Sequence, residues 1–258
     1  MPIKVSDLAI APVKGLRLAQ ADELDIQASG AVGDRTFVVV DDENQLLLTA
    51  RTPKLVQVEQ RWDPASGDLT LRFPDGSEAS GVPRPSETVS TGLYDGRRIT
   101  GRLVSGPHGA ALSGHLGRPV RLMALDQNEV GADDFPVTLM STASVTALGE
   151  ALDGRGEPDP RRFRMTVTVD GASAWEEHGW AGREVDVGEV RLRIVDPVPR
   201  CVVTTRDPEN GRRDVPVLQT LAKLRGKRNV NFGVWCEVTR PGRVRRGDPV
   251  VPLGVAPT

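Results

Sequence analysis

The sequence contains few of the residues that build common catalytic sites and covalent frameworks. Among its 258 residues are two cysteines, three histidines and one tyrosine. Two cysteines give neither a disulfide framework nor a Cys-x-x-Cys metal clip, and the histidines form no His-x-x-x-His pair of the kind found in zinc hydrolases. The glycine-rich loops of nucleotide folds and the Gly-x-Ser-x-Gly elbow of serine hydrolases are also missing. These absences argue against the usual hydrolases and nucleotide-binding proteins, and they fit a reducing compartment.

Neither sign of charge is in excess, and long hydrophobic runs are missing. Lys and Arg number 33 against 35 for Asp and Glu. Such a chain has no overall field that would recruit nucleic acid or an anionic membrane. No stretch reaches the roughly 20 apolar residues of a membrane span, and the first residues lack a signal-peptide core. We therefore expect a soluble, cytoplasmic protein that binds neither nucleic acid nor membrane.

Glycine and proline, by contrast, are frequent, with 27 and 20 residues. Valine-rich runs alternate with turn signals about every ten residues, which favours many short strands over long helices. A polar stretch over residues 80–119 separates the two halves. The sequence predicts a mainly β (α+β) protein with a few helices, in two domains that cover residues 1–118 and 119–258.

Individual elements follow from the same patterns. Residues 3–62 are expected to form an antiparallel meander, which includes a hairpin of strands 35–40 and 46–49. In the second half, strands are expected at 120–125, 161–169, 185–195 and 232–238, and helices at 145–152 and 216–224.

The segment around Cys201 carries the strongest chemical signal. Pro197 and Pro199 lack a backbone donor, so the strand before them is expected to end and to leave the thiol on a turn. Arg200 would favour the thiolate, the form that attacks electrophiles and binds soft metals. Cys201 is thus a candidate ligand or nucleophile, and a small buried hydrophobe is the alternative. Cys236, in contrast, falls on the apolar face of a predicted strand and is expected in the core.

Polar groups that suit a phosphorylated ligand occur in the first half of the chain. Lys14 and Gly15 follow the first strand and offer an ammonium group and an open backbone, although a solvated loop lysine is the alternative. Arg35 begins a buried strand, where its guanidinium could hold an anion bidentately. An ion pair with Asp34 would explain Arg35 equally well.

Two similar stretches occur in the second half. Ser141 and Thr142 stand at an expected helix N-terminus, where free N–H groups favour an anion, and N-capping is the alternative. In the expected strand 161–169, alternation places Arg164 and Thr166 on the face opposite the core. The three arginines of residues 161–164 suggest an anionic ligand, and a solvated basic edge is the alternative.

The order and spacing of these stretches resemble the MOSC superfamily, in the form that carries a MOSC N-terminal β-barrel domain followed by a MOSC domain, as amidoxime-reducing components do. The most specific element is Arg-Cys-x-x-Thr-Thr-x-Asp-Pro-x-x-Gly at residues 200–211. It is joined by Pro-Val-Lys-Gly at 12–15, Gly-Asp-Arg-Thr-Phe at 33–37 and Arg-Phe-Arg at 162–164. The resemblance covers nearly the whole chain and implies a β-barrel-like lobe packed on a MOSC β-barrel domain.

The resemblance also implies a molybdenum cofactor, with Cys201 as the thiolate ligand of the metal and the catalytic residue. It places the other matched residues around the pterin and its phosphate: Lys14, Gly15, Arg35, Ser141, Thr142, Arg164, Thr166 and Arg200. Two positions depart from the family pattern. Met165 and Thr166 stand where the family has Pro-Asn, and Pro199 stands where Ser is common. These departures put one amide and one hydroxyl contact to the pterin in question.

The implied reaction is the two-electron reduction of a small N-hydroxylated substrate, such as an amidoxime, a hydroxylamine or an N-hydroxylated base. The chain lacks the four cysteines of an iron–sulfur cluster. Electrons are therefore expected from a separate protein, such as a ferredoxin, a flavodoxin or a cytochrome b5-like protein with its reductase. MOSC domains also end cofactor sulfurases, so a sulfur carrier with a Cys201 persulfide is an alternative. A non-catalytic carrier of the molybdenum cofactor is another.

Overall fold

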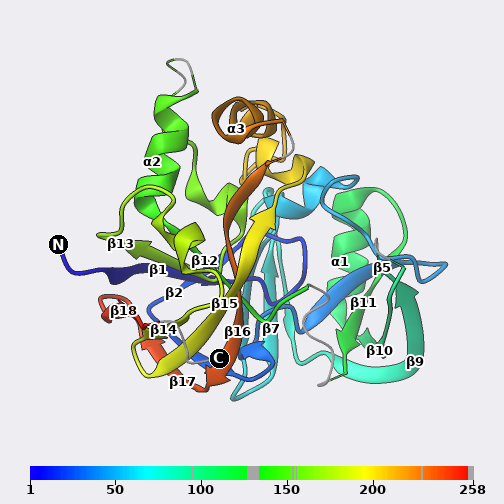
Figure 1. The fold of residues 1–258 in the computed structure, drawn as a ribbon. Coiled ribbons are helices and arrows are strands. Elements are labelled where there is room, and N and C mark those ends of the chain that lie inside the picture. Colours follow the sequence, from blue (N-terminus) through cyan, green and yellow to red (C-terminus); the bar gives the residue numbers. More distant parts are fainter. Residues whose placement is uncertain (94–95, 127–133, 153, 155, 228, 255–258) are drawn as a thin grey trace.

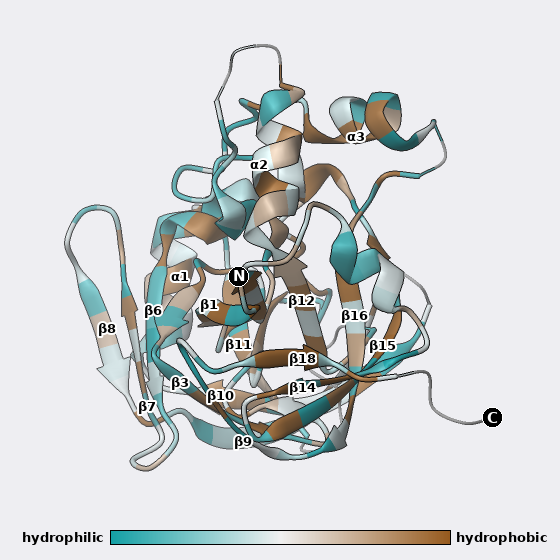
Figure 2. Cartoon of the chain, turned by 60° about the vertical axis from the view of Figure 1, so that its left-hand side comes forward, coloured by the Kyte–Doolittle hydropathy of each residue, from teal (hydrophilic) through white to brown (hydrophobic). Residues whose placement is uncertain are grey.

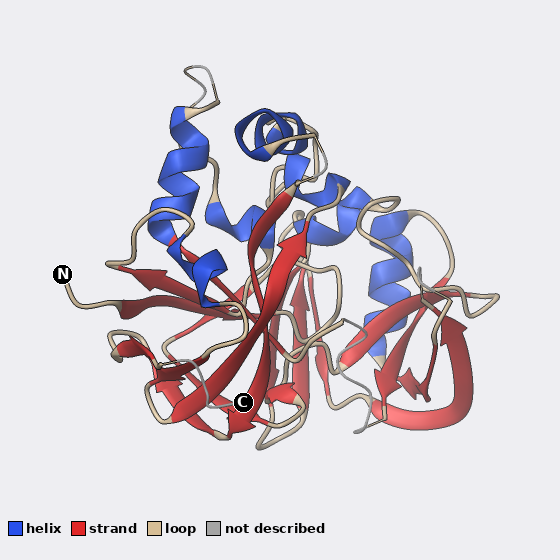
Figure 3. Ribbon diagram, viewed as in Figure 1, coloured by secondary structure: helices blue, strands red, loops and turns tan. Residues whose placement is uncertain are grey.

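Strands dominate the structure. The computed structural model describes residues 1–258 apart from 94–95, 127–133, 153, 155, 228 and 255–258. The described residues contain three α-helices and several short 3-10 helices beside the strands (Figure 3). This confirms the expected mainly β protein with a few helices. Within the described part, no helix has the length and apolar character of a membrane span.

The largest sheet has eight strands and takes them from both ends of the chain (Figure 1). In spatial order these are β18 (Val250–Pro252), β14 (Glu184–Val187), β15 (Val190–Pro199), β16 (Asn231–Arg240), β12 (Val137–Ser141), β13 (Val167–Asp170), β1 (Lys4–Ile10) and β2 (Ala19–Ala21). β12 and β13 pair in parallel, and β1 pairs with β13 in antiparallel fashion. The first strand of the chain therefore belongs to the sheet of its second half.

Three smaller sheets complete the fold. The first consists of β5 (Phe37–Asp41), β11 (Val120–Leu125), β10 (Arg98–Ser105) and β9 (Arg84–Gly92). The second consists of β17 (Gly242–Arg245), β3 (Glu23–Gln27) and β4 (Gly30–Ala31), and the third of β6 (Glu59–Asp63), β7 (Asp68–Arg72) and β8 (Glu78–Gly81). Among the described strands, the outer strands of each sheet do not pair with one another. The barrels implied by the family resemblance are therefore not closed.

The expected meander over residues 3–62 is confirmed only in part: β1 pairs with β2 and β3 with β4 in antiparallel fashion, but β1, β3 and β5 also pair with distant partners. β1 pairs with β13, β3 with β17, and β5 with β11. In β5, four consecutive residues from Phe37 to Val40 are buried, so this strand has neighbours on both faces. The predicted partner strand at 46–49 is reduced to one bridge between Val40 and Leu46. Burial on both faces favours a long-range partner over a local hairpin.

The expected strand at 161–169 is also wrong in its first half. Pro160–Phe163 forms the 3-10 helix η2, and β13 begins only at Val167. Asp159 caps η2, because its carboxylate accepts the N–H of Arg161, and Pro160 occupies the first helical position, which needs no donor. Arg164 ends η2 in the left-handed conformation, so it does not alternate with Thr166 along one strand.

Contrary to expectation, β15 continues through Pro197 and Pro199. Pro197 lies opposite Val234 and Pro199 lies opposite Asn231, and the register shifts before each proline. A proline carbonyl can still accept a hydrogen bond. The register shifts place each proline where the ladder needs no N–H donor. The strand expected at 185–195 is in fact a hairpin of β14 and β15, turned at Gly188.

The α-helices are α1 (Pro107–Leu116), α2 (Thr142–Glu150) and α3 (Val217–Arg225), and the other 3-10 helices are η1 (Pro53–Gln57), η3 (Glu176–Trp180) and η4 (Val202–Thr205). Hydrophobic residues line the strands of the main sheet, among them β14 and β18 (Figure 2). Beside this core, a separate cluster packs α2 and α3 against the ends of β15 and β16.

The expected boundary between two domains near residue 118 stays a prediction.

Candidate functional site

Cys201 lies at the end of β15, in the position before η4. Its backbone is extended, and its carbonyl accepts hydrogen bonds from the N–H and the hydroxyl of Thr204 at 3.2 and 3.0 Å. The residue is exposed. Exposure removes the alternative of a buried hydrophobe and leaves the thiol accessible to a ligand or a metal. Cys236 is fully buried in β16, as expected, and burial raises the pKa of its thiol.

Arg200 connects the Cys201 turn to the segment that carries Arg164. Its guanidinium donates to the carbonyl of Phe163 at 3.0 Å and to the carbonyl of Phe232 at 2.7 and 2.9 Å. These carbonyls belong to two phenyl residues whose rings stack with centroids 3.8 Å apart. Backbone carbonyls therefore hold the guanidinium of Arg200 in a defined position, and Arg200 directly precedes Cys201 in the sequence.

Arg164 continues these contacts toward the N-terminal half. Its guanidinium donates to the carbonyl of Leu16 at 2.9 Å, one residue after Gly15. Gly15 has a φ of 92°, and an added Cβ there would meet the hydroxyl of Thr49 at 3.0 Å, so the turn after β1 requires glycine. Lys14 donates its backbone N–H to the carbonyl of Phe37. The Lys14–Gly15 turn and Arg164 are therefore neighbours.

Arg35 lies close to the same turn. Its N–H donates to the carbonyl of Ala11, and its guanidinium pairs with the carboxylate of Asp34, as one of the two predicted alternatives had it. The described residues include four non-glycine residues with positive φ, and two of them are Arg35 and Arg164, at 51° and 53°. Such strained backbone clusters at ligand sites.

Thr166 lies deeper, between β1 and β12. Its N–H donates to the hydroxyl of Thr138 at 3.0 Å, its carbonyl accepts the N–H of Ala9, and it is 2% exposed. This threonine therefore supports the strands beneath the arginines, and its hydroxyl lies 3.3 Å from that of Thr138.

Ser141 and Thr142 are not brought to this cluster. Ser141 pairs with Val169, and Thr142 donates to the carboxylate of Asp170 at 3.0 Å, so both lie at the C-terminal end of β13. Arg164 precedes the other end of that strand, where it caps η2. Ser141 caps α2, as the predicted alternative had it, and it is fully buried.

Glu177 is a buried residue that the sequence did not single out. Its carboxylate accepts hydrogen bonds from the hydroxyls of Ser141 at 3.0 Å and Ser144 at 2.8 Å. Burial raises the pKa of this carboxyl, and the serine hydrogen bonds act against that rise. The one signal in the sequence was an acid placed between two large aromatic residues, Trp175 and Trp180.

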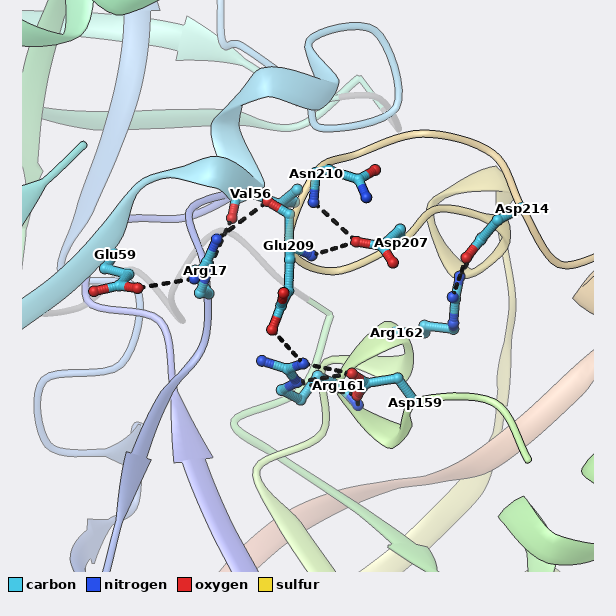
Figure 4. Close-up of polar contacts among 10 residues, drawn as sticks. All are labelled: Arg17, Val56, Glu59, Asp159, Arg161, Arg162, Asp207, Glu209, Asn210 and Asp214. Carbon is cyan, nitrogen blue, oxygen red and sulfur yellow. Dashed lines mark hydrogen bonds and ion pairs between the residues drawn. The ribbon is translucent and has the colours of Figure 1, made fainter. Parts of the chain in front are cut away.

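Two of the three clustered arginines bind carboxylates of the chain itself. Arg162 forms a bidentate pair with Asp214 at 2.5 and 2.7 Å, and Arg161 contacts both Asp159 and Glu209 (Figure 4). An anionic ligand is therefore not needed to explain these two. Their pairing could not be read from the sequence, because the partners lie up to 52 residues away.

The loop that follows Cys201 is fastened to the N-terminal half. Arg17 donates to the carbonyl of Glu209 at 3.1 Å, and Gln57 donates to the carbonyl of Asn210 at 2.9 Å. Arg206 reaches the carbonyl of Ala50 at 2.9 Å. These contacts position the Cys201 turn against residues 14–17.

The donors present fit a molybdenum–pterin group. Such a group needs a soft thiolate for its metal and cationic or N–H donors for its phosphate and pterin. The accessible thiol of Cys201 provides the first, and the cations of Lys14, Arg164 and Arg200 provide the second, while the guanidinium of Arg35 is paired with Asp34. Arg35 and Arg164 both have left-handed backbone, a strained conformation that is common at ligand sites.

Comparisons with known proteins identify two families along the chain. Residues 126–251 match the MOSC domain, and residues 2–95 match the MOSC N-terminal beta barrel domain. The human mitochondrial amidoxime reducing component 2 is 27% identical over 95% of this chain and 82% of its own length. Human molybdenum cofactor sulfurase is 23% identical over 98% of this chain, which spans 32% of that protein. The YuaD protein from Bacillus subtilis aligns over 97% of this chain and 94% of its own, with a TM-score of 0.48 and 14% identity.

Proposed function

The chain belongs to the MOSC superfamily, with a MOSC N-terminal domain followed by a MOSC domain, and from this premise we propose that it is a molybdenum-cofactor-dependent oxidoreductase. The observation that carries the proposal is the exposed thiol of Cys201, which directly follows Arg200 in the chain, while the Arg200 guanidinium contacts the segment that carries Arg164. A buried thiol, or arginines spread over separate surfaces, would not support it.

Each residue of the cluster has a distinct task in this proposal. Cys201 holds the metal through its thiolate, and Arg164 and Arg200 bind the anionic phosphate and the pterin oxygens. Lys14 adds a cation, and Arg35 adds a guanidinium at the same turn. Thr166 keeps β13 in place through Thr138. When bound, the cofactor supplies two-electron redox chemistry at molybdenum.

The substrate class that we propose is a small N-hydroxylated compound such as an amidoxime, a hydroxylamine or an N-hydroxylated base. Two electrons and two protons cleave its N–O bond and give the N–H product and water. Similarity to an amidoxime reducing component supports this class. We propose that a separate protein delivers the electrons.

The test compares the two cysteines of the chain. Protein from a host that makes the cofactor is assayed for molybdenum content and for benzamidoxime reduction with a chemical reductant. For Cys201→Ser we expect turnover to fall about a thousandfold, a barrier increase of about 4 kcal/mol. For the control Cys236→Ala we expect unchanged turnover per folded molecule and a loss of stability of about 1 kcal/mol. Undiminished reduction by Cys201→Ser would reject the assignment.

A sulfur carrier is the second candidate function. An exposed cysteine can hold a persulfide, and the match to molybdenum cofactor sulfurase covers nearly all of this chain. Mass spectrometry after incubation with a cysteine desulfurase separates the two candidates. A carrier gains the mass of one sulfur atom on Cys201, and a reductase alone does not.

A further inference from the structure

Five exposed cations at residues 51–54, 118 and 212–213 have no carboxylate partner among the described residues. They are Arg51, Lys54, Arg118, Arg212 and Arg213, and together they are called the basic face. Most other arginines of the described chain that lie at the surface pair with an acid, as Arg191 does with Asp186 and Arg245 with Glu23. With a formal net charge of −2 for the whole chain, five unpaired cations in one area form a local excess.

The basic face is continuous across the two halves of the chain. Arg51, Lys54 and Arg118 line one cavity of about 490 Å³, and Arg118 also donates to the hydroxyl of Thr52. Gly211 packs against the carbonyl of Pro53 so closely that an added Cβ would lie 2.5 Å from it. Arg212 and Arg213 follow Gly211 directly. Residues 51–54, which lead into η1, and the loop with residues 211–213 therefore form one surface.

Acidic residues of this surface are used for other contacts. Asp207 accepts the N–H groups of Glu209 and Asn210, Glu209 pairs with Arg161, and Asp214 pairs with Arg162 (Figure 4). In the cavity, the Asp41 carboxylate accepts two N–H groups of its own turn. These carboxylates hold loops in shape, and the five cations are left facing solvent.

The basic face begins close to the candidate metal ligand. Cys201 and Arg206 are separated only by the 3-10 helix η4, which is about 8 Å long at the usual rise. The backbones of Arg206 and Arg213 form an isolated antiparallel β-bridge. The guanidinium of Arg206 donates to the carbonyls of Gly211 and Ala50. A protein docked on the basic face would therefore be held beside the Cys201 turn.

We propose that the basic face is the docking site of an acidic electron-carrier protein. The inference rests on the proposed function, which requires a protein that delivers electrons. Charge complementarity is the reason to expect that this partner is acidic. Unpaired surface cations steer an acidic partner and speed its encounter, an effect that salt screens. A weak, salt-sensitive complex suits a carrier that must leave after each transfer.

The test measures binding directly, so that it does not depend on turnover. Calorimetric titrations use the cofactor-loaded protein with an acidic flavodoxin, a plant-type ferredoxin and a cytochrome b5 haem domain, at about 20 mM and about 300 mM salt. We expect at least one carrier to bind at low salt. In Arg212→Glu/Arg213→Glu and in Arg51→Glu/Lys54→Glu, we expect its Kd to rise about tenfold at low salt and the difference to shrink at high salt.

The control variant is Arg102→Glu/Arg183→Glu. Both arginines are exposed and lack a carboxylate partner among the described residues, and they lie on β10 and next to β14, outside the basic face. We expect this variant to bind the carrier as the unchanged protein does. An equal loss in the control, or no binding of any carrier at low salt, would overturn the proposal. So would binding of the basic face to anionic lipid vesicles in place of the carriers.

Turnover distinguishes this proposal from the proposed function. With reduced methyl viologen as a small donor, the basic-face variants are expected to reduce benzamidoxime like the unchanged protein, and with the carrier as donor they are expected to be slower. Absence of reduction with either donor would reject the proposed function, while the binding result would still decide whether the basic face docks a carrier.

Discussion

The sequence predicts a metal ligand or nucleophile at the Cys201 turn and an anion site at the N-terminus of α2, but the two regions differ in the structure. At the Cys201 turn, the thiol is exposed and the guanidinium groups of Arg164 and Arg200 are held by backbone carbonyls. At α2, the hydroxyls of Ser141 and Ser144 are buried against the carboxylate of Glu177. The difference depends on Glu177, which comes from a distant segment. Its carboxylate accepts hydrogen bonds from the hydroxyls of Ser141 and Ser144, so these groups are bonded internally and do not face a ligand.

The largest expected effect comes from removing that acid. Glu177→Ala leaves two buried hydroxyls without their acceptor, so we expect the free energy of unfolding to fall by about 3 kcal/mol. For a chain of this size the melting temperature would drop by about 6–12 °C. In Glu177→Gln, which keeps an acceptor, the loss should be about half as large. Molybdenum content per folded molecule should stay the same in both variants, and a fall in content would link α2 to the site.

The opposite behaviour is expected at Arg164. Glycine adopts a φ of 53° without strain, so Arg164→Gly should stay within about 1 kcal/mol of the original stability. The guanidinium is lost, and we expect cofactor retention in a dialysis assay to fall about tenfold or more, which is about 1.4 kcal/mol. Retention equal to that of the unchanged protein would show that Arg164 does not contact the cofactor.

His178 follows Glu177 in η3 and gives a pH test. Burial, with smaller contributions from Arg225 and Arg200, lowers its pKa to about 4. Since the unfolded value is near 6.5, the folded state binds this proton less well, and stability is lost as the pH falls from about 6.5 to about 4. We expect a loss on the order of 1 kcal/mol after allowance for partial exposure, measured by urea unfolding at several pH values.

His178→Phe is the matched variant for this pH effect. It removes the titrating group, so the decrease on acidification should become smaller by that amount. Glu177 changes stability in the opposite sense, since its raised pKa costs stability as the pH rises. An identical acid response in His178→Phe would show that His178 is not responsible.

The smallest effect is expected at Thr142. Its hydroxyl contacts the carboxylate of Asp170 at the surface, so Thr142→Ala should cost less than about 0.5 kcal/mol. Cofactor retention should not change. A clear loss of molybdenum in this variant would bring the start of α2 back into the site, as the family resemblance implied.

Several parts of the molecule followed from the sequence because their signals are local. Alternating apolar residues predicted the strands β11 and β16 and the burial of Cys236 in the core, and the structure confirms all three. The pattern at 216–224 gave α3. The Cys201 motif identified the accessible thiol, since prolines and arginine around a cysteine are visible without knowledge of the fold.

Other parts depend on contacts between distant residues and could not be predicted. The pairing of β1 with β13 and of β5 with β11 joins residues at least 79 positions apart. Asp159 and Pro160 start a 3-10 helix where alternation indicated a strand. The sequence suggested that the hydroxyl of Ser141 and the guanidinium of Arg162 face a ligand. In the structure, the carboxylate of Glu177 accepts a hydrogen bond from Ser141, and the carboxylate of Asp214 pairs with Arg162. Sequence patterns show which groups are available, but not which internal partner binds them first.

The thiolate bond from Cys201 to molybdenum is tested most directly by X-ray absorption at the molybdenum edge, on protein purified from a host that makes the cofactor. We predict that the sulfur shell around the metal loses one scatterer in Cys201→Ser and stays complete in Cys236→Ala. A sulfur shell that is the same in all three proteins, or a purified wild-type chain without molybdenum, would contradict the account.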